Sequence, residues 1–308
     1  MTDSILLLGK DGQVGHELAR LLPNLTKTQA LGRRDLDLAQ LSQISQIVRQ
    51  IRPAVIINAA AYTHVDGAES ERDLAYAVNA DAPRVLAQEA EALGALLIHF
   101  STDYVFDGTK RTPYVESDTP NPINWYGQTK LEGEIAIRAC QVEHWIIRTS
   151  WVYSTWRDCF VTKVLRWARE QPSLTIVRDQ WGSPTWSRTL AEQTVEALKV
   201  WQNQNPGRAE GLSGTYHLAA VGAPSRYEWA KAILQLDPHK EEQIATEVNP
   251  ATQDAFPSPA RRPTFTALSS HRFESAFRAT LPAWEVALSA AMGSSRGDMV
   301  AGKLPPLL

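Results

Sequence analysis

The sequence predicts an α/β protein with a Rossmann-type doubly wound parallel sheet and a smaller C-terminal substrate lobe. Three observations support this fold class. Short apolar runs alternate with helical patterns along residues 1–150, the order expected when helices cover both faces of a parallel sheet. The first run passes directly into a glycine-rich turn. A tyrosine and a lysine, Tyr126 and Lys130, then lie four residues apart in a predicted helix.

The apolar runs define the elements of the first half. Residues 41–51 show helical periodicity with Ile44 and Val48 inward, and Pro53 follows as a helix breaker. Gly94 ends the next long helical pattern. The predicted strands are 5–8, 28–31, 54–58, 95–100 and 145–148, and the predicted helices are 14–22, 41–51, 75–93 and 126–139.

The second half has a looser pattern that combines sheet completion with a smaller lobe. Helices are predicted at 160–170, 187–201 and 227–236 and strands at 174–177 and 216–218, and the segment 249–263 is proline-rich. We therefore predict a Rossmann domain at 1–150, and its glycine-rich turn and its tyrosine–lysine pair predict that this domain binds NADP(H) and carries the catalytic residues. An interleaved substrate-binding segment is predicted at 151–292, and a loosely ordered tail, rich in Gly, Ser and Pro, at 293–308.

Bulk composition excludes several classes of protein. The 308 residues are 44% hydrophobic and carry a net charge of −3, which argues against nucleic-acid binding. No apolar stretch approaches the ~18 residues of a membrane helix. The first apolar run is too short for a signal peptide, so a cytoplasmic protein is expected. Cys140 and Cys159 have no metal-ligand spacing and are expected to be free thiols.

The glycine-rich turn predicts a dinucleotide site. Gly9, Gly12 and Gly15 directly follow the first strand and open a helix. Such a turn lets the backbone approach a pyrophosphate, and the helix N-terminus offers free N–H groups to it. After the second strand, Arg33 and Arg34 favour the 2′-phosphate of NADPH.

An acidic residue at the same point would instead accept from the ribose of NADH. Asp35 and Asp37 follow the two arginines and leave that cofactor open.

The tyrosine–lysine pair predicts carbonyl chemistry. Residues four apart share one helix face, so Lys130 is expected to favour the phenolate of Tyr126 and to lower its pKa. Thr102 ends a predicted strand, where doubly wound sheets bind ligands. Its hydroxyl and that of Tyr126 would together form a two-donor site for a developing alkoxide.

Longer phrases make a family resemblance visible. The glycine turn, NAAA at 58–61, STDYVFDG at 101–108 and YGQTK at 126–130 follow one another in the order of an extended short-chain dehydrogenase/reductase. The phrases AAAYTHVD at 59–66, RTSWVY at 148–153, DQWGSPT at 179–185 and PARRP at 259–263 are more specific. From about Ile5 to about Trp284 the chain resembles the dTDP-4-dehydrorhamnose reductase family.

The resemblance implies that NADPH reduces the 4-keto group of dTDP-4-dehydro-L-rhamnose to give dTDP-L-rhamnose. Tyr126 would donate the proton, and Thr102 would orient the carbonyl. Lys130 would lower the pKa of Tyr126 and hold the nicotinamide ribose. The expected cofactor contacts are Gly9, Gly12, Gln13, Val14, Gly15, Arg33, Asp37, Leu38, Ala59, Ala61, Tyr62, Thr63, Phe100, Tyr126 and Lys130. The expected substrate contacts are Thr102, Asp103, Trp151 and Arg262, the last toward the diphosphate.

One departure bears on metal binding. Some family members dimerise around Mg²⁺, but Arg188 stands where the ligating glutamate is expected. We therefore predict no required metal and a monomer or homodimer. His64, His99 and His144 lack ligand spacing and are expected to be ordinary core or surface histidines.

Two other functions remain open. The first is an epimerase or dehydratase of the same superfamily, although Tyr104 rather than glutamate follows Asp103, which argues against a dehydratase. The second is a non-catalytic NADP-binding regulatory subunit resembling the methionine adenosyltransferase β subunit. The intact Thr102, Tyr126 and Lys130 argue against that role.

Overall fold

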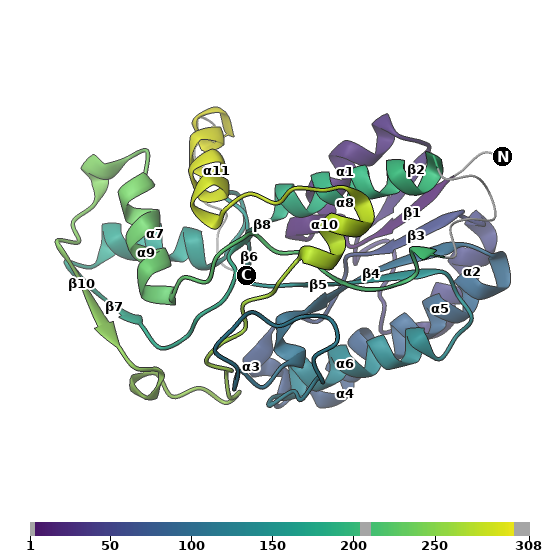
Figure 1. Ribbon diagram of the computed structural model, residues 1–308, viewed down its shortest axis with the longest axis horizontal. Coiled ribbons are helices and arrows are strands. Elements are labelled where there is room, and N and C mark those ends of the chain that lie inside the picture. The colour runs from purple at the N-terminus through teal and green to yellow at the C-terminus, as the bar shows by residue number, and fades with distance from the viewer. Residues whose placement is uncertain (1–3, 204–210, 299–308) are drawn as a thin grey trace.

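The computed structural model describes residues 4–203 and 211–298 and contains a six-stranded sheet whose paired strands are all parallel (Figure 1). The strands are β1 (Ile5–Leu8), β2 (Thr28–Leu31), β3 (Val55–Asn58), β4 (Leu96–Thr102), β5 (His144–Thr149) and β9 (Gly214–His217). They lie in the order β2-β1-β3-β4-β5-β9. The order reverses between β1 and β3, so a ligand crevice is expected at the carboxyl ends of these strands.

Helices cover both faces of the sheet (Figure 1). One face carries α1 (Gln13–Leu21), α8 (Ser187–Asn203) and α10 (His271–Phe277), and the other carries α2 (Leu41–Ile51), α5 (Ala82–Leu93) and α6 (Trp125–Arg138). Successive residues of β1 serve opposite cores. Ile5 and Leu7 pack in the first, and Leu6 and Leu8 pack in the second. This double burial explains why β1 is a continuous apolar run rather than an alternating one.

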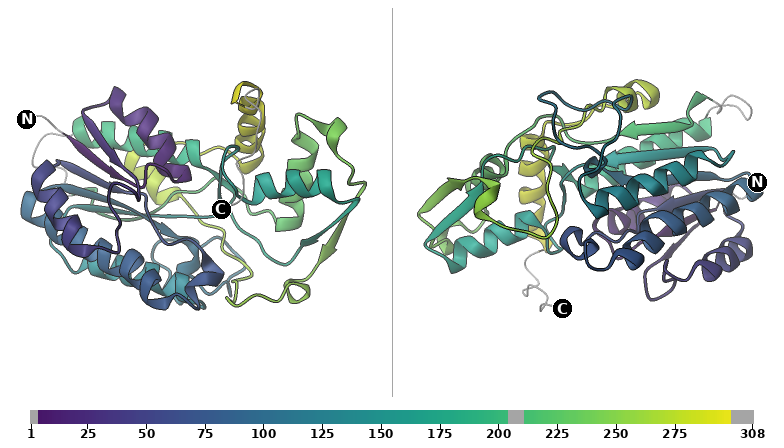
Figure 2. Two further views of the ribbon diagram at one scale, coloured as in Figure 1. Left: turned by 180° about the vertical axis from the view of Figure 1, so that it is seen from behind. Right: turned by 90° about the horizontal axis from the view of Figure 1, so that it is seen from below.

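A smaller lobe stands beside the sheet, at the end of the molecule away from the N-terminus (Figures 1 and 2). It contains α7 (Phe160–Glu170), β7 (Ser173–Val177), α9 (Arg226–Leu236) and β10 (Glu247–Ala251), and β7 pairs in parallel with β10. Ser225 and Glu228 form a capping box that starts α9. The parallel pair β6 (Val152–Tyr153) and β8 (Thr185–Trp186) and the helix α11 (Trp284–Asp298) complete the second half.

The stretch 75–93 is helical throughout, as predicted, but it is not one regular α-helix. After α3 (Val65–Ala68), α4 (Arg72–Tyr76) passes into a π-helical turn at Ala77–Asp81 and then into α5. Pro83 explains the wider turn, because a proline ring clashes with the carbonyl four residues earlier, here that of Asn79. The Asn79 side chain binds the backbone of Tyr62 through Oδ1 (2.9 Å) and Nδ2 (3.0 Å).

Two further differences lie in the second half. Strand β10, for which no strand was predicted, overlaps the start of the proline-rich segment 249–263, since β7 supplies a partner for its backbone. Helix α11 continues through residues 293–298 of the predicted tail, and residues 299–308 lie outside the described residues. The division of the chain at residue 150 stays a prediction. Within the described ranges, no helix has both the length and the apolar character needed to cross a bilayer.

Candidate active site

A cavity of about 430 Å³ opens at the switch point between β1 and β3. The glycine turn lines this cavity. Gly9 has a φ of +88°, and a Cβ at this position would lie 2.7 Å from the Ala60 nitrogen. Glycine is therefore required both by the backbone conformation and by the close approach of the β3 loop. Gly15 does not line the cavity, because its Cα faces the Gly9 carbonyl, where a Cβ would overlap it.

The other predicted cofactor residues gather around this cavity. They are Gly9, Gly12, Gln13, Val14, Arg33, Asp37, Leu38, Ala59, Ala61, Tyr62, Thr63, Phe100, Tyr126 and Lys130. Of the two arginines after β2, only Arg33 lines it. The carboxylate of Asp35 is occupied elsewhere, by Lys10 Nζ at 2.6 Å and by the Gly32 N–H at 2.9 Å. Contact of these residues with a cofactor stays a prediction.

The segment 152–157, which consists of β6 and the four residues after it and is here called the strap, contacts the glycine turn. Gln13 Nε2 donates to the Val152 carbonyl (3.3 Å), and Ser154 Oγ donates to Gln13 Oε1 (2.8 Å). Arg157 donates to the Asp11 carbonyl and lines the cavity. The strap could not be predicted from the sequence, because these partners lie some 140 residues apart.

The residues present fit a dinucleotide. The turn between Gly9 and Gln13 brings backbone close to the cavity at the start of α1, which suits a pyrophosphate. Thr149 also lines the cavity, and its buried Oγ1 has no hydrogen-bond partner among the described residues. A buried hydroxyl left without a partner is costly, so a polar ligand group beside Thr149 would satisfy it.

Helix α6 carries the predicted catalytic pair. Its N-cap is Asn124, whose Oδ1 accepts from the Gly127 N–H at 2.8 Å. Tyr126 and Lys130 both line the cofactor cavity. The Nζ atom of Lys130 nevertheless points toward the protein interior. Its Nζ lies 2.7 Å from the Phe100 carbonyl oxygen and 3.1 Å from His99 Nε2.

The expected lowering of the Tyr126 pKa is wrong for this geometry. Burial raises its pKa well above that of an ordinary tyrosine, a hydrogen bond with Thr102 opposes the rise, and the charge of Asp103 adds to it. Burial also lowers the pKa of Lys130 to about 8, and the charge of Glu134 partly offsets this. Desolvation therefore outweighs the attraction between the two groups.

Thr102 and Asp103 form a buried polar cluster behind the tyrosine. Thr102 Oγ1 accepts from the Tyr104 N–H (3.2 Å) and donates to Asp103 Oδ1 (3.1 Å), and Ser150 Oγ donates to Asp103 Oδ2 (2.8 Å). Burial raises the pKa of Asp103, although these hydroxyl hydrogen bonds lower it in part. Neither Thr102 nor Asp103 lines either of the two main cavities.

A second cavity, of about 1360 Å³, adjoins the first at Gln13, Thr63 and Val152. Predicted substrate residues Trp151 and Arg262 line it. Trp151 has a φ of +45°, a strained conformation for a tryptophan. Such strain is concentrated at functional sites, so it favours the predicted role of this residue.

Arg226 is the main site residue that the sequence did not predict. It lines the second cavity with its guanidinium carbon 3.7 Å from the Trp151 ring centroid. Burial lowers its pKa to about 10, so it remains a cation at neutral pH. Arg226 and Arg262 both hydrogen-bond with the Tyr104 side chain, and Arg262 Nη2 also lies 2.6 Å from Asp66 Oδ2. The cavity thus holds two neighbouring cations.

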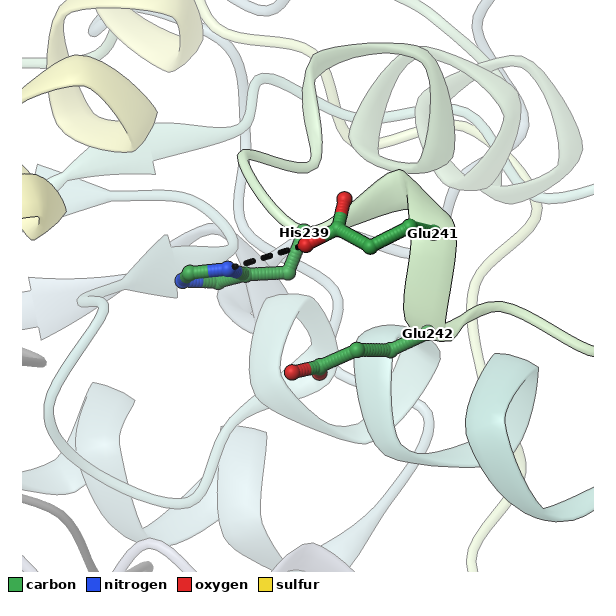
Figure 3. Close-up of side chains that lie close together, drawn as sticks. All are labelled: His239, Glu241 and Glu242. Carbon is green, nitrogen blue, oxygen red and sulfur yellow. Dashed lines mark ion pairs between the residues drawn. The ribbon is translucent and has the colours of Figure 1, made fainter.

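Outside these cavities, one group of potential metal ligands was found in the described ranges (Figure 3). His239, Glu241 and Glu242 lie on the lobe with ligand atoms within 4.8 Å of one another. Glu242 already pairs with Arg169 at 2.6 Å, and His239 Nδ1 lies 3.6 Å from Glu241. Arg188 stands where a Mg²⁺-ligating glutamate was expected, and its Nε lies 3.4 Å from Glu17 Oε2. The expectation that no metal is required stays a prediction.

Fold and site together define a class. A Rossmann-type parallel sheet, a glycine turn beside one cavity, and a half-buried tyrosine with a buried lysine on one helix are the features of a short-chain dehydrogenase/reductase-type oxidoreductase. The family model for the RmlD substrate binding domain matches residues 2–296. The dTDP-4-dehydrorhamnose reductase of Burkholderia thailandensis is 40% identical over 289 residues, which cover 92% of this chain and 96% of that enzyme. The chain belongs to the dTDP-4-dehydrorhamnose reductase family.

Two further comparisons agree. The dTDP-4-dehydrorhamnose reductase of Escherichia coli K12 is 38% identical over 288 residues, 92% of this chain and 95% of that enzyme. The crystal structure of dTDP-4-dehydrorhamnose reductase from Bacillus anthracis in complex with NADP is 33% identical, with a TM-score of 0.86 over 96% of this chain and 100% of that one. The predicted family, fold class and enzyme class are confirmed.

Proposed function

We propose that this enzyme uses NADPH to reduce the 4-keto group of dTDP-4-dehydro-L-rhamnose, giving dTDP-L-rhamnose, with Tyr126 as the proton donor. The observation that carries the proposal is the position of Tyr126, which lines the dinucleotide-sized cavity one helical turn before Lys130 on α6. We further propose a cytoplasmic enzyme that acts as a monomer or homodimer.

The cofactor would occupy the first cavity. The backbone around Gly9 and Gly12 suits the pyrophosphate, Arg33 suits the 2′-phosphate, and Thr149 Oγ1 and Lys130 suit polar groups of the nicotinamide end. When bound, NADPH supplies the hydride that reduces the sugar carbonyl. The chain's own residues have to orient the carbonyl, exclude water and provide the proton.

Tyr126 is suited to the role of acid. Because burial raises its pKa, its phenol keeps the proton throughout the neutral range. An alkoxide is a stronger base than a phenolate, so transfer of the Tyr126 proton to a developing alkoxide is downhill. Thr102 Oγ1 donates to Asp103 and can act on a substrate oxygen only if its hydroxyl rotates away from that carboxylate.

The second cavity would hold the nucleotide sugar. Arg226 and Arg262 supply two cations close together, which matches the charge of a diphosphate. Trp151, with the Arg226 guanidinium over its ring, offers a flat apolar surface to a sugar or base.

The test is NADPH absorbance with two substrates, dTDP-4-dehydro-L-rhamnose and the unepimerised dTDP-4-dehydro-6-deoxy-D-glucose. The proposal predicts stoichiometric NADPH consumption with the first and formation of dTDP-L-rhamnose. Turnover of the second alone would reassign the substrate. Tightly bound NAD⁺ that survives purification, with interconversion of sugars and no net NADPH consumption, would instead indicate an epimerase.

A further inference from the structure

His99 occupies a buried position between two other polar side chains. It is only 1% exposed, on β4, and links Asn58 of β3 to Lys130 of α6. Its Nδ1 lies 3.1 Å from Asn58 Nδ2, and its Nε2 lies 3.1 Å from Lys130 Nζ. The three side chains form a continuous chain of hydrogen bonds from the interior of the sheet to the cofactor cavity.

The direction of the first hydrogen bond follows from Asn58. Its Oδ1 accepts from the Ala60 N–H at 3.1 Å, so the NH₂ group of the amide faces His99. An amide nitrogen can only donate. Nδ1 of His99 must therefore accept, and a neutral imidazole then carries its single N–H on Nε2.

This tautomer determines which protonation state of Lys130 the contact with His99 favours. The Nε2–H of His99 points at Lys130 Nζ across 3.1 Å. An ammonium group has only donors, so it would face that N–H with another N–H. A neutral amine has a lone pair that accepts the His99 proton, and it still donates to the Phe100 carbonyl at 2.7 Å.

We propose that Asn58 and His99 are positioning residues that hold Lys130 as a neutral amine while its Nζ lies against His99. The proposal rests on the active-site role proposed for Lys130. Lys130 would take a proton from solvent and become a cation only when Nζ turns away from His99. Before that, an uncharged Lys130 does not favour the Tyr126 phenolate, so the tyrosine keeps its proton. Afterwards the new charge stabilises the phenolate that proton donation leaves.

The surrounding charges are compatible with an uncharged Lys130. Glu134, one turn further along α6, is the carboxylate that acts on it. That carboxylate is shared with Arg148 of β5 at 2.6 Å, with Arg138 at 3.1 Å and with the Ser101 hydroxyl at 2.6 Å. The other titratable group on this face of α6 is Tyr126. Burial lowers the pKa of Lys130 to about 8, and an N–H of His99 facing Nζ would lower it further, toward the neutral amine.

The direct test reads the His99 tautomer by long-range ¹H–¹⁵N NMR of the whole enzyme labelled with [¹⁵N]histidine, with His99→Gln used to assign the signals. The expected result is a neutral ring protonated at Nε2 from pH 6 to pH 9. A ring protonated at Nδ1, or at both nitrogens, in that range would overturn the proposal. The measurement requires no enzymatic activity, so it stands apart from the proposed reductase function.

Asn58→Asp provides a second, independent measurement. Aspartate places an acceptor opposite Nδ1, so His99 should switch to the Nδ1–H form and offer a lone pair to a Lys130 ammonium. The Lys130 pKa, followed through its [¹³C]lysine Cε signal and assigned with Lys130→Arg, should rise by about one unit or more. A charge effect alone would raise this pKa and leave the tautomer unchanged. An unchanged tautomer in the variant therefore contradicts the inference.

Discussion

The buried ion pair between Glu134 and Arg148 holds α6, the helix of the proposed catalytic pair, against the sheet. Both side chains are at most 3% exposed, and two parallel hydrogen bonds join them, Nε to Oε1 at 2.9 Å and Nη2 to Oε2 at 2.6 Å. Glu134 lies one turn beyond Lys130 on α6, and Arg148 lies on β5. Replacing Arg148 with methionine should leave the carboxylate of Glu134 buried with weaker partners.

The expected cost is large. Removing one partner of a buried pair costs about 3–5 kcal/mol. Ser101 and Arg138 still donate to Glu134 in the variant, so the lower end, about 3 kcal/mol, is expected. A native protein of ordinary stability has about 5–15 kcal/mol in total. The unfolding midpoint should fall by roughly 5 °C, since an unfolding entropy of about 2.1 cal/mol/K per residue over 308 residues corresponds to about 1.5 °C per kcal/mol.

Urea unfolding of Arg148→Met, read by circular dichroism, measures this loss. Arg138→Met is the matched control, because Arg138 binds the same carboxylate at 3.1 Å from a side chain that is 37% exposed. An exposed partner is worth about 0–1 kcal/mol. Equal losses in the two variants would refute the reasoning that burial, rather than charge pairing alone, makes the Arg148 contact strong.

Three further outcomes are expected. Arg226→Met should raise KM for the nucleotide sugar by about tenfold or more, with KM for NADPH little changed, because it removes one of two cations from the second cavity. Steady-state kinetics with each substrate varied in turn measures both constants, and an equal rise in the two would contradict the assignment. Gly9→Ala should weaken NADPH binding in a fluorescence titration, because φ is +88° and the new Cβ would lie 2.7 Å from the Ala60 nitrogen; unchanged affinity would remove the glycine turn from the cofactor site. Burial, aided by the charge of Arg148, lowers the pKa of His217 to about 3. The unfolded chain therefore binds a proton below about pH 6.5 that the fold does not, and stability should fall as pH drops from about 6.5 toward 3. His217→Asn should remove about 2 kcal/mol of that loss by pH 5, and an identical pH profile of unfolding in both proteins would argue against the account.

The features that the sequence predicted correctly are local. β1 is buried on both faces and needs four apolar residues in succession, so the run itself identifies it. Gly9 has a positive φ and lies next to another backbone segment, and glycine is the residue type that tolerates both conditions. Tyr126 and Lys130 share one helix, so their spacing alone brings them to one cavity.

The features that it did not predict depend on tertiary contacts. Arg226 is one of many arginines in the sequence, and only the packing of α9 brings it over Trp151. The strap binds Gln13 from residues some 140 positions away. His99 was expected to be an ordinary histidine, and its importance depends on the direction in which the Asn58 amide points. The pKa of Tyr126 was expected to fall, because the sequence shows a nearby lysine but not the extent of burial.

The most direct test of the central claim is the single-turnover rate of NADPH oxidation by Tyr126→Phe with dTDP-4-dehydro-L-rhamnose. Tyr76→Phe is the matched control, since Tyr76 is 38% exposed and stacks on Trp125 outside the cofactor cavity. Loss of the proton donor should slow the reaction by about 100-fold or more in Tyr126→Phe and leave Tyr76→Phe at the wild-type rate. A Tyr126→Phe enzyme that folds, binds NADPH and reduces the sugar at the wild-type rate would contradict the proposed mechanism.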